Sequence, residues 1–123
     1  SRGAESAVFV EQRRDAVRLI RENLELTGLA DRGRVVNGDA MAFLSGEPGG
    51  FDLIFVDPPY ALNLWEQTLE EISRFDILRG HGIIICECPV EHSLPERVGA
   101  CVCHRTYRYG KIKITTYHRE EQP

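Results

Sequence analysis

The sequence lacks long apolar runs and any excess of basic charge. No hydrophobic segment approaches the roughly 20 residues that a membrane-spanning helix needs, and no signal-peptide pattern is present. The formal net charge of −4 excludes a generally basic coat for nucleic acid, so any such contact must come from a local patch. A cytoplasmic protein with no membrane partner is therefore expected.

The sequence also lacks a clear metal-ligand spacing. Its four cysteines form the pairs Cys86-x-Cys88 and Cys101-x-Cys103, without the two-residue gap typical of a zinc knuckle. Both pairs lie in apolar, strand-like segments, which favours small buried thiols over a zinc site. No metal is expected, and the scattered histidines are predicted at the surface: His81, His92, His104 and His118.

The length and the hydrophobic periodicity predict one α/β domain over residues 1–123, with strand and helix patterns in alternation. The expected strands cover residues 7–10, 35–36, 51–56 and 83–87, and the first of them is predicted to be buried. Helical patterns cover about 12–28, 41–44 and 64–75. Gly28 is expected to end the first helix, and Gly80 to Gly82 is expected to break the chain before the fourth strand.

Two helices show an amphipathic pattern that predicts which side chains face the core. The inward residues of the first are expected to be Ala16, Val17, Leu19, Ile20 and Leu24. The inward residues of the second are expected to be Leu64, Thr68, Leu69 and Ile72.

The C-terminal part changes to two alternating segments, 100–108 and 111–118, joined by Tyr109-Gly110. This pattern predicts a β-hairpin that adds antiparallel pairing to an otherwise parallel sheet. Ile112 and Ile114 are expected to face inward, and their neighbours outward: Lys111, Lys113 and Thr115.

The most informative motif is Asp57-Pro58-Pro59-Tyr60, directly after the apolar run 51–56. Prolines lack the N–H that a strand ladder needs, and Pro58 restricts Asp57 to an extended conformation, so the strand must end at this aspartate. Ligands of open α/β sheets bind at the carboxyl ends of the strands. The motif therefore predicts a functional carboxylate there, although the same residues can form a simple strand-terminating turn.

Two other acids follow predicted strands in the same way, Glu11 after the first and Asp39 after the second. Because carboxyl ends of parallel strands share one edge of a sheet, all three carboxylates are expected on the ligand edge.

In this order, the motifs resemble those of class I S-adenosylmethionine-dependent methyltransferases, and more narrowly the RsmD-like family, which methylates the N2 amine of a guanine in 16S ribosomal RNA. The resemblance runs nearly end to end, and Asp57 to Tyr60 is its most specific part. The other matching segments are Ser1-Arg2-Gly3-Ala4, Phe9-Val10-Glu11, Arg21-Glu22-Asn23-Leu24, Gly38-Asp39-Ala40, 51–56 and Tyr109-Gly110.

The resemblance implies a Rossmann-like sheet, mostly parallel, with a C-terminal antiparallel hairpin. The family begins with a strand and a glycine-rich loop that hold the methionine part of the cofactor, and neither is present in this sequence. The chain is therefore expected to be the C-terminal part of a longer enzyme, a truncated domain missing its first strand. The absence of that strand is expected to leave two unpaired ladder edges, which must close on each other, recruit another chain by self-association, or stay exposed.

For the cofactor S-adenosylmethionine, the resemblance implies that Glu11 holds the ribose hydroxyls. It also implies that Asp39 accepts a hydrogen bond from the adenine amine, with the Ala40 backbone N–H nearby. The structural alternatives are a helix-start acid at Glu11 and a turn or cap at Asp39.

For the substrate, the resemblance implies that Asp57 and the carbonyl of Pro58 accept the two hydrogens of the exocyclic amine, while Tyr60 stacks on the extruded base. Packing beside the prolines is an alternative role for Tyr60. The implied partner is ribosomal RNA or a small-subunit assembly particle. Candidate RNA contacts lie on the hairpin, where lysines can also simply discourage aggregation: Arg105, Tyr107, Arg108, Tyr109, Lys111, Lys113 and Arg119.

Two other functions remain open at this point. The motif Asp57-Pro58-Pro59-Tyr60 also serves adenine-N6 or cytosine-N4 methylation of DNA. A non-catalytic remnant that binds a partner protein through its unpaired edges is the third possibility.

Overall fold

A computed structural model describes residues 3–46, 49–57 and 64–120 of the chain. The chain divides into two compact units, residues 1–43 and 44–123, and the division falls inside helix α2 (Ala40–Gly46). The expectation of a single domain over residues 1–123 stays a prediction.

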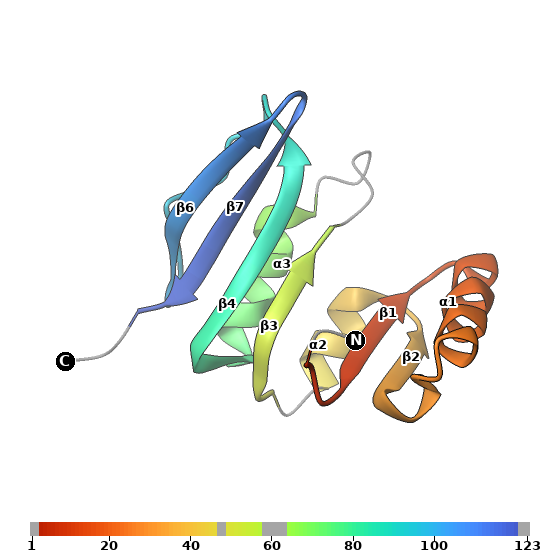
Figure 1. Ribbon diagram of the computed structural model, residues 1–123. Helices are drawn as coiled ribbons and strands as arrows, with labels where there is room; N and C mark the ends of the chain where they lie inside the picture. The colour runs from red at the N-terminus through yellow and green to blue at the C-terminus, as the bar shows by residue number, and fades with distance from the viewer. Residues whose placement is uncertain (1–2, 47–48, 58–63, 121–123) are drawn as a thin grey trace. The chain divides into compact units, whose positions relative to one another are not determined.

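The first unit contains two parallel strands and the helix that connects them (Figure 1). Strand β1 (Ala7–Glu11) pairs with β2 (Gly33–Asn37) from Ala7 beside Gly33 to Glu11 beside Asn37. Helix α1 (Arg14–Leu26) and the short 3-10 helix η1 (Ala30–Arg32) lie between them in the chain. This strand–helix–strand order is the one predicted.

Helix α1 ends at a glycine, as its sequence predicts. The N–H of Gly28 donates to the carbonyl of Glu25, and the N–H of Leu29 donates to the carbonyl of Leu24, at 3.1 and 2.8 Å. This bond pair is a Schellman motif, which requires a left-handed residue at the position of Gly28 (φ +73°). The chain can therefore turn directly back into β2.

Burial in the first unit differs from the prediction at two side chains. Val17 is 2% exposed, but Leu19 is 57% exposed and does not face inward. Phe9 in β1 is also exposed, so the first strand is not the buried one expected. A sheet of two strands covers only a narrow stripe of α1, which explains why fewer apolar residues are buried than the helical pattern suggests.

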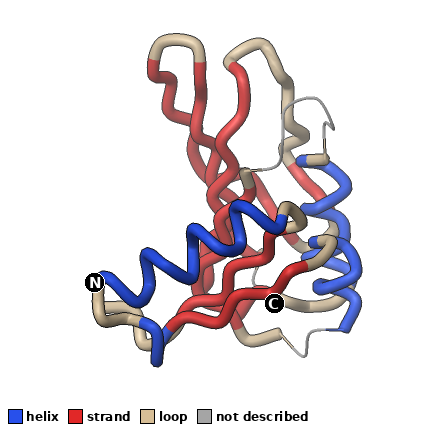
Figure 2. Tube along the Cα trace, turned by 90° about the vertical axis from the view of Figure 1, so that its right-hand side faces the viewer, coloured by secondary structure: helices blue, strands red, loops and turns tan. Residues whose placement is uncertain are grey.

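The second unit contains a five-stranded mixed sheet in the order β3-β4-β7-β6-β5 (Figures 1 and 2). The five strands are β3 (Phe51–Val56), β4 (Leu78–Pro89), β5 (Arg97–Val98), β6 (Cys101–Tyr109) and β7 (Ile112–Arg119). The pair β3–β4 is parallel, and all other pairs are antiparallel. The predicted α/β fold with a C-terminal antiparallel hairpin is confirmed, and antiparallel pairing extends to both sides of that hairpin.

Strand β4 is continuous through Gly80 to Gly82, so the predicted break there is wrong. Phe51 of β3 pairs with Leu78 of β4, and the next pair is Leu53 with Ile83. Strand β4 therefore has more residues than β3 between these two pairs, which marks a bulge. A Cβ on the buried Gly82 would lie 3.0 Å from the carbonyl oxygen of Asp52 and closer still to the Leu78 side chain. The glycine therefore permits a close approach of strands within a bulge.

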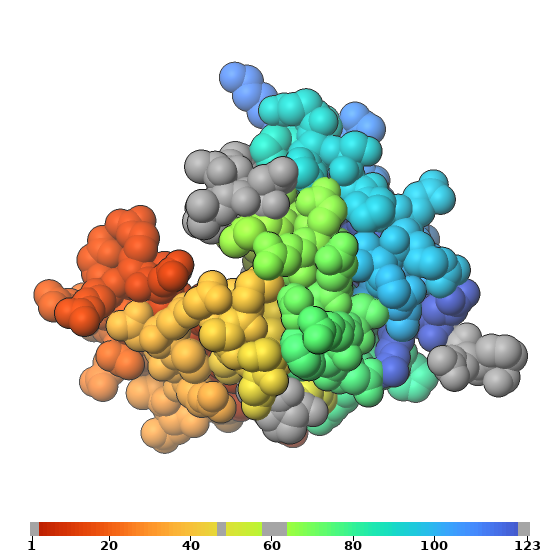
Figure 3. Space-filling model, turned by 180° about the vertical axis from the view of Figure 1, so that it is seen from behind, coloured from red at the N-terminus to blue at the C-terminus, as the bar shows by residue number. Residues whose placement is uncertain are grey.

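Helix α3 (Trp65–Arg74) covers one face of the second unit's sheet. Its buried side chains include the predicted Thr68, Leu69 and Ile72, together with Trp65, whereas the predicted Leu64 is half-buried. Figure 3 shows this side, with α3 next to the segment that contains β5. The hydroxyl of Ser73 accepts a hydrogen bond from the N–H of Ala100 at 2.9 Å, which joins the two segments.

The hairpin of β6 and β7 is confirmed, with Gly110 in its turn at φ +60°, but the predicted facing of β7 is wrong. Lys113 and Thr115 are buried, while Ile112 and Ile114 are half-buried. Directly opposite residues of paired strands share a face, and Lys113 lies opposite the buried Cys88 of β4. The face under α3 is therefore the one that carries Lys113 and Thr115 of β7.

The other face of the sheet carries exposed apolar side chains. Leu53 and Phe55 of β3 are 60% and 58% exposed, and Ile83 of β4 is 45% exposed. Within the ladders of the described residues, β3 is an edge strand of this sheet, and β1 and β2 are the two edges of the other. These edges pair with no described residue, and the expectation that a missing strand lies next to them stays a prediction.

Candidate functional site

Asp57 directly follows the last residue of β3, as the double proline predicts. Val56 is buried and pairs with Cys86, whereas Asp57 is exposed at the carboxyl end of the strand. Among the described residues, no side chain or backbone group bonds to its carboxylate. Pro58 and Tyr60 fall outside the described residues, so the roles predicted for them stay predictions.

The neighbouring end of β4 is fixed to the start of α3 by the only tryptophan of the chain. The indole Nε1–H of Trp65 donates to the main-chain carbonyl of Glu87 at 2.8 Å, and the ring is 1% exposed. A buried indole needs such an acceptor, so this bond fixes the carboxyl end of β4.

A second contact joins α3 to the turn after β4. His92 Nε2 lies 2.8 Å from Glu66 Oε1. The His92 ring packs against the Trp65 ring, with 4.6 Å between the two ring centroids. The side chain of His92 is 19% exposed, so the prediction of a surface residue is wrong for it. His81, His104 and His118 are exposed as predicted.

Glu11 lies at the carboxyl end of β1, half-buried. One carboxylate oxygen accepts the N–H of Arg13 at 3.1 Å, and the main-chain carbonyl accepts the N–H of Gly38 at 3.0 Å. The side-chain amide of Asn37, with its nitrogen toward β1, donates to the carbonyls of Glu11 and Gln12, both at 3.2 Å. The end of β1 is thereby tied to the end of β2.

Asp39 lies two residues beyond β2 and caps the helix that follows. Its Oδ2 accepts the N–H of Ala42 at 3.2 Å, and its carbonyl accepts the N–H of Phe43 at 3.0 Å. Ala40 is the first residue of α2. The cap described as the alternative role of Asp39 is therefore present, and it uses only one of the two carboxylate oxygens.

These positions form two groups, one in each unit. Glu11 and Asp39 lie together at the carboxyl ends of the paired strands β1 and β2, and Asp57 lies at the carboxyl end of β3. In the first group each carboxylate keeps one oxygen with no hydrogen bond from the described residues. Such acceptors fit the hydroxyl and amine donors of an adenosine group.

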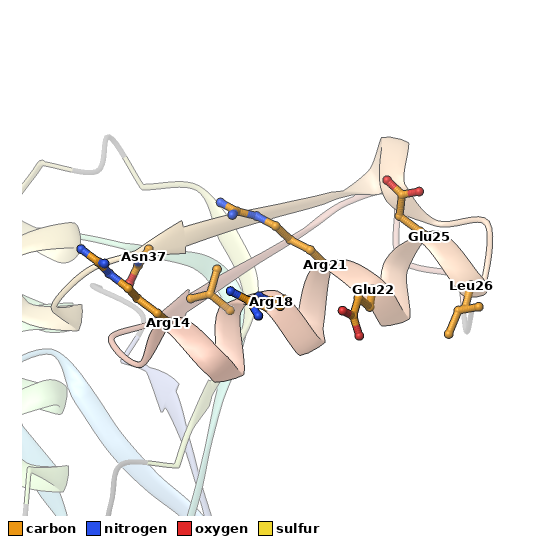
Figure 4. Close-up of a pocket in the computed structure, with 8 residues that line it drawn as sticks. Arg14, Arg18, Arg21, Glu22, Glu25, Leu26 and Asn37 are labelled. Atoms are coloured by element: carbon orange, nitrogen blue, oxygen red, sulfur yellow. The ribbon is translucent and has the colours of Figure 1, made fainter.

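A hollow of about 710 Å³ in the first unit lies along α1 and away from most of these residues (Figure 4). Of its lining, only Asn37 belongs to a strand end near Glu11. The remaining lining residues come from α1: Arg14, Val17, Arg18, Arg21, Glu22, Glu25 and Leu26. The predicted site residues are therefore not the residues that line this hollow.

The RNA contacts predicted on the hairpin are only partly available. Lys113 is 8% exposed, and Arg119 is held by Asp76 at 2.5 Å and by the Leu78 carbonyl at 3.3 Å. The prediction that these two contact RNA is therefore not supported. The exposed members of the set are Arg105, Tyr107, Arg108, Tyr109 and Lys111.

The cysteines are free thiols, and Cys86, Cys88 and Cys101 are buried. Burial raises the pKa of Cys86 from 9.0 to about 12, and burial likewise raises the pKa of Cys88 and of Cys101. Within residues 3–46, 49–57 and 64–120, no three His, Cys, Asp or Glu side chains cluster as metal ligands. In the same ranges, no helix is long and apolar enough to cross a membrane.

Sequence reasoning missed three residues near the end of β3. The sequence alone leaves Glu87 without an assigned role and does not indicate the anchoring by Trp65 and His92. One signal was present for Glu87: the segments 53–57 and 83–87 are both apolar runs that end in a carboxylate. The contact of His92 with Glu66 spans 26 residues, and no local pattern indicates it.

Comparisons with known proteins identify the family of the chain. The model of the family described as "Conserved hypothetical protein 95" matches residues 1–118. The "Ribosomal RNA small subunit methyltransferase D" of Escherichia coli (strain K12) is 33% identical over 122 residues, covering 99% of this chain and 61% of the relative. The "Putative rRNA methyltransferase YlbH" of Bacillus subtilis (strain 168) is 32% identical, covering 97% of this chain and 66% of the relative.

A solved structure gives the same result for the fold. The "Putative methyltransferase yhhF from Escherichia coli" superposes with a TM-score of 0.82 at 32% identity, covering 99% of this chain and 67% of that one. The chain spans 61% and 66% of the lengths of the two curated relatives. The chain belongs to the RsmD-like family of class I S-adenosylmethionine-dependent methyltransferases.

Proposed function

We propose that a protein containing this chain transfers a methyl group from S-adenosylmethionine to the exocyclic N2 amine of a guanine in 16S ribosomal RNA. The observation that carries the proposal is the exposed Asp57 at the carboxyl end of the parallel strand β3, followed in sequence by Pro58-Pro59-Tyr60. Membership of the family supports the reaction class. The substrate is ribosomal RNA, free or in a small-subunit assembly particle.

The chemistry explains the need for a carboxylate at Asp57. An exocyclic guanine amine is a weak nucleophile because its lone pair is delocalised into the ring. When the Asp57 carboxylate and the Pro58 carbonyl accept its two hydrogens, the nitrogen becomes more tetrahedral and its lone pair is directed away from the ring. Positioning of this kind supplies most of the catalysis, and Asp57 is also placed to accept the released proton.

Tyr60 is proposed to stack on the target base once it leaves the helix. Enzymes that modify bases read an extruded base by stacking and by hydrogen bonds to its edge. The exposed hairpin residues Arg105, Arg108 and Lys111 are proposed to contact the RNA backbone.

The cofactor is proposed to bind at the ends of β1 and β2. Glu11 accepts from the ribose hydroxyls, and Asp39 accepts from the adenine amine with the Ala40 N–H beside it. The free carboxylate oxygen at each acid supports this assignment. When bound, S-adenosylmethionine supplies an electrophilic methyl group.

The test is methyl transfer by a protein of the relatives' length, with ribosomal RNA, small-subunit particles and duplex DNA as acceptors. Asp57→Ala is expected to abolish transfer to RNA while the melting temperature and cofactor affinity stay nearly unchanged. The matched control is Asp52→Ala, which removes an exposed carboxylate at the other end of β3 and a surface ion pair with Arg79.

The outcomes separate the alternatives. Transfer to DNA alone identifies an adenine-N6 or cytosine-N4 methyltransferase. Absence of transfer to every acceptor, with a folded protein, favours a non-catalytic binding module. Equal loss of stability and activity in Asp57→Ala gives this residue a structural role instead.

A further inference from the structure

Two adjacent strands of the second unit end in a carboxylate at the same level. The parallel ladder of β3 and β4 runs in register from Leu53 beside Ile83 to Val56 beside Cys86. Continued by one residue, this register sets Asp57 beside Glu87. Neighbouring strands lie roughly 4.8 Å apart, so the two acids are immediate neighbours.

Both acids belong to the face that α3 does not cover. Side chains alternate along a strand, and Val56 and Cys86 are buried on the α3 side. Asp57 and Glu87 therefore follow Phe55 and Ile85 on the other face. Asp57 is exposed and Glu87 is half-buried.

The Glu87 carboxylate is free while its backbone is fixed. Its main-chain carbonyl is held by the Trp65 indole at 2.8 Å, and the Trp65 ring is buried. Within the described part of the chain, no hydrogen bond or ion pair involves the Glu87 carboxylate. A half-buried acid on a rigid strand end, without a structural partner, is suited to bind a donor from a ligand.

A guanine presents two donor groups side by side on its Watson–Crick edge, the N2 amine and the N1–H. An ionised carboxylate can only accept hydrogen bonds. We propose that Glu87 accepts the N1–H of the target guanine while Asp57 binds the neighbouring N2 amine. This proposal rests on the proposed function and names the residue that makes the site specific for guanine.

The same geometry disfavours adenine as a substrate. The N1 atom of adenine is an acceptor, so a carboxylate facing it leaves two acceptors opposed and unpaired. Sites built to bind a substrate hydrogen reject analogues that lack it far more strongly than apolar pockets reject a missing methylene. Among enzymes that share the Asp-Pro-Pro-Tyr motif, a carboxylate at the position of Glu87 thus favours methylation of guanine N2 over methylation of adenine N6.

The test compares two bases that share the 2-amine and differ at N1 and C6, in the unmodified protein and in a Glu87 variant. First, the methylated position is mapped in ribosomal RNA with the unmodified, relative-length protein. Short RNAs carrying guanine or 2,6-diaminopurine at that position are then bound in the presence of S-adenosylhomocysteine, which cannot donate a methyl group. Diaminopurine keeps the 2-amine but has an acceptor at N1 and an amine in place of the oxygen at C6. The change that Glu87→Gln makes in the ratio of the two dissociation constants therefore reports the N1 contact.

The unmodified protein is expected to bind the guanine RNA about tenfold or more tightly than the diaminopurine RNA. Glu87→Gln is expected to bring the two within about threefold, because an amide can donate as well as accept. Asp57→Asn is expected to weaken both RNAs without changing their ratio, since both bases carry the 2-amine. Glu91→Gln, an exposed acid in the turn after β4, is the control and keeps the original ratio.

Two results overturn the inference. One is equal binding of the two RNAs by the unmodified protein, which requires no variant and so is decisive even if Glu87→Gln fails to fold. The other is a folded Glu87→Gln protein that keeps the guanine preference. Failure of the proposed function is distinguishable, because the mapping step then finds no N2-methylated guanine.

Discussion

Glu66 Oε1 lies 2.8 Å from Nε2 of His92, and this contact joins the first turn of α3 to the turn that follows β4. The two side chains are 35% and 19% exposed. Together with the bond from Trp65 to Glu87, the contact holds α3 against the end of the strand next to Asp57. The end of β4 next to Asp57 is thus held by contacts between residues that lie far apart in the sequence.

His92→Ala is expected to lower the free energy of unfolding by about 1 to 2 kcal/mol, because it removes a part-buried hydrogen bond and the ring packed on Trp65. Urea denaturation measures the change. The matched control is His81→Ala at an exposed position, where a change within about 0.5 kcal/mol is expected. Equal effects of the two substitutions would contradict the supporting role of His92.

The buried thiols are expected to make the protein less stable at alkaline pH. Burial raises the pKa of Cys86 from 9.0 to about 12, so between these values the unfolded chain releases a proton that the folded chain keeps. Fewer protons bound in the unfolded state mean that stability falls as pH rises. Denaturation under reducing conditions at neutral pH and at about pH 10 tests this, with Cys86→Ala expected to show a smaller fall.

The same burial predicts which thiol reacts first in the folded protein. Cys103 is half-buried, whereas Cys86, Cys88 and Cys101 are buried. A thiol reagent at neutral pH is expected to modify Cys103 first and the other three only after unfolding. Mass spectrometry of peptides after timed labelling measures the order, and early modification of Cys86 would contradict the packing of β4 against α3.

Substitutions at the ends of β1 and β2 are expected to weaken cofactor binding. Glu11→Gln and Asp39→Asn keep the shape of each side chain but remove its charge, and each is expected to raise the dissociation constant for S-adenosylmethionine about tenfold. Calorimetric titration of the relative-length protein measures it. Glu22→Gln on the exposed side of α1 serves as the control and should leave binding unchanged.

Titration of the chain alone with S-adenosylmethionine is a separate experiment. Binding would show that the residues of β1, β2 and their surroundings suffice for the cofactor. The absence of binding would show that the remaining part of the relatives' length is needed.

The apolar face and open edge of β3 are expected to make the chain self-associate. Leu53 and Phe55 are largely exposed on a strand whose outer edge pairs with no described residue. Leu53→Lys is expected to shift the chain toward monomer, because a lysine on an edge strand opposes strand pairing. Sedimentation velocity at several concentrations measures this. Leu19→Lys, at an equally exposed apolar position on α1, is the control and should not change the association.

Much of the fold follows from local sequence signals. Strand β3 ends at Val56, Gly28 terminates helix α1 and Gly110 lies in the turn between β6 and β7, each as a signal within a few residues predicts. The order of the elements is likewise predictable, because the periodicity that distinguishes a strand from a helix is a local property of the sequence.

The errors arise where tertiary contacts override a local pattern. Gly80 to Gly82 indicates a break, but the neighbouring β3 supplies a ladder that carries the strand through as a bulge. In β7, period-two alternation allows either face to be the covered one. The register with β4 puts Lys113 opposite Cys88 under α3, and the greater hydrophobicity of Ile112 and Ile114 indicates the wrong face.

The candidate site shows the same division. The positions of Asp57, Glu11 and Asp39 could be predicted because each lies at the end of a strand pattern or within two residues of it, whereas their roles stay predictions. Glu87 could not be given a role from sequence alone, because its position beside Asp57 depends on the register of two strands separated by a helix.

The indole of Trp65 is the only one in the chain, and it is held at the end of β4. This gives the protein an intrinsic optical reporter at the strand end that carries Glu87, buried on the α3 side of the sheet and thus opposite the face proposed to bind a base. Because the ring is buried beside His92, its emission responds to any movement of α3 away from the strand ends. Tryptophan fluorescence can therefore follow local opening of α3 without an added label.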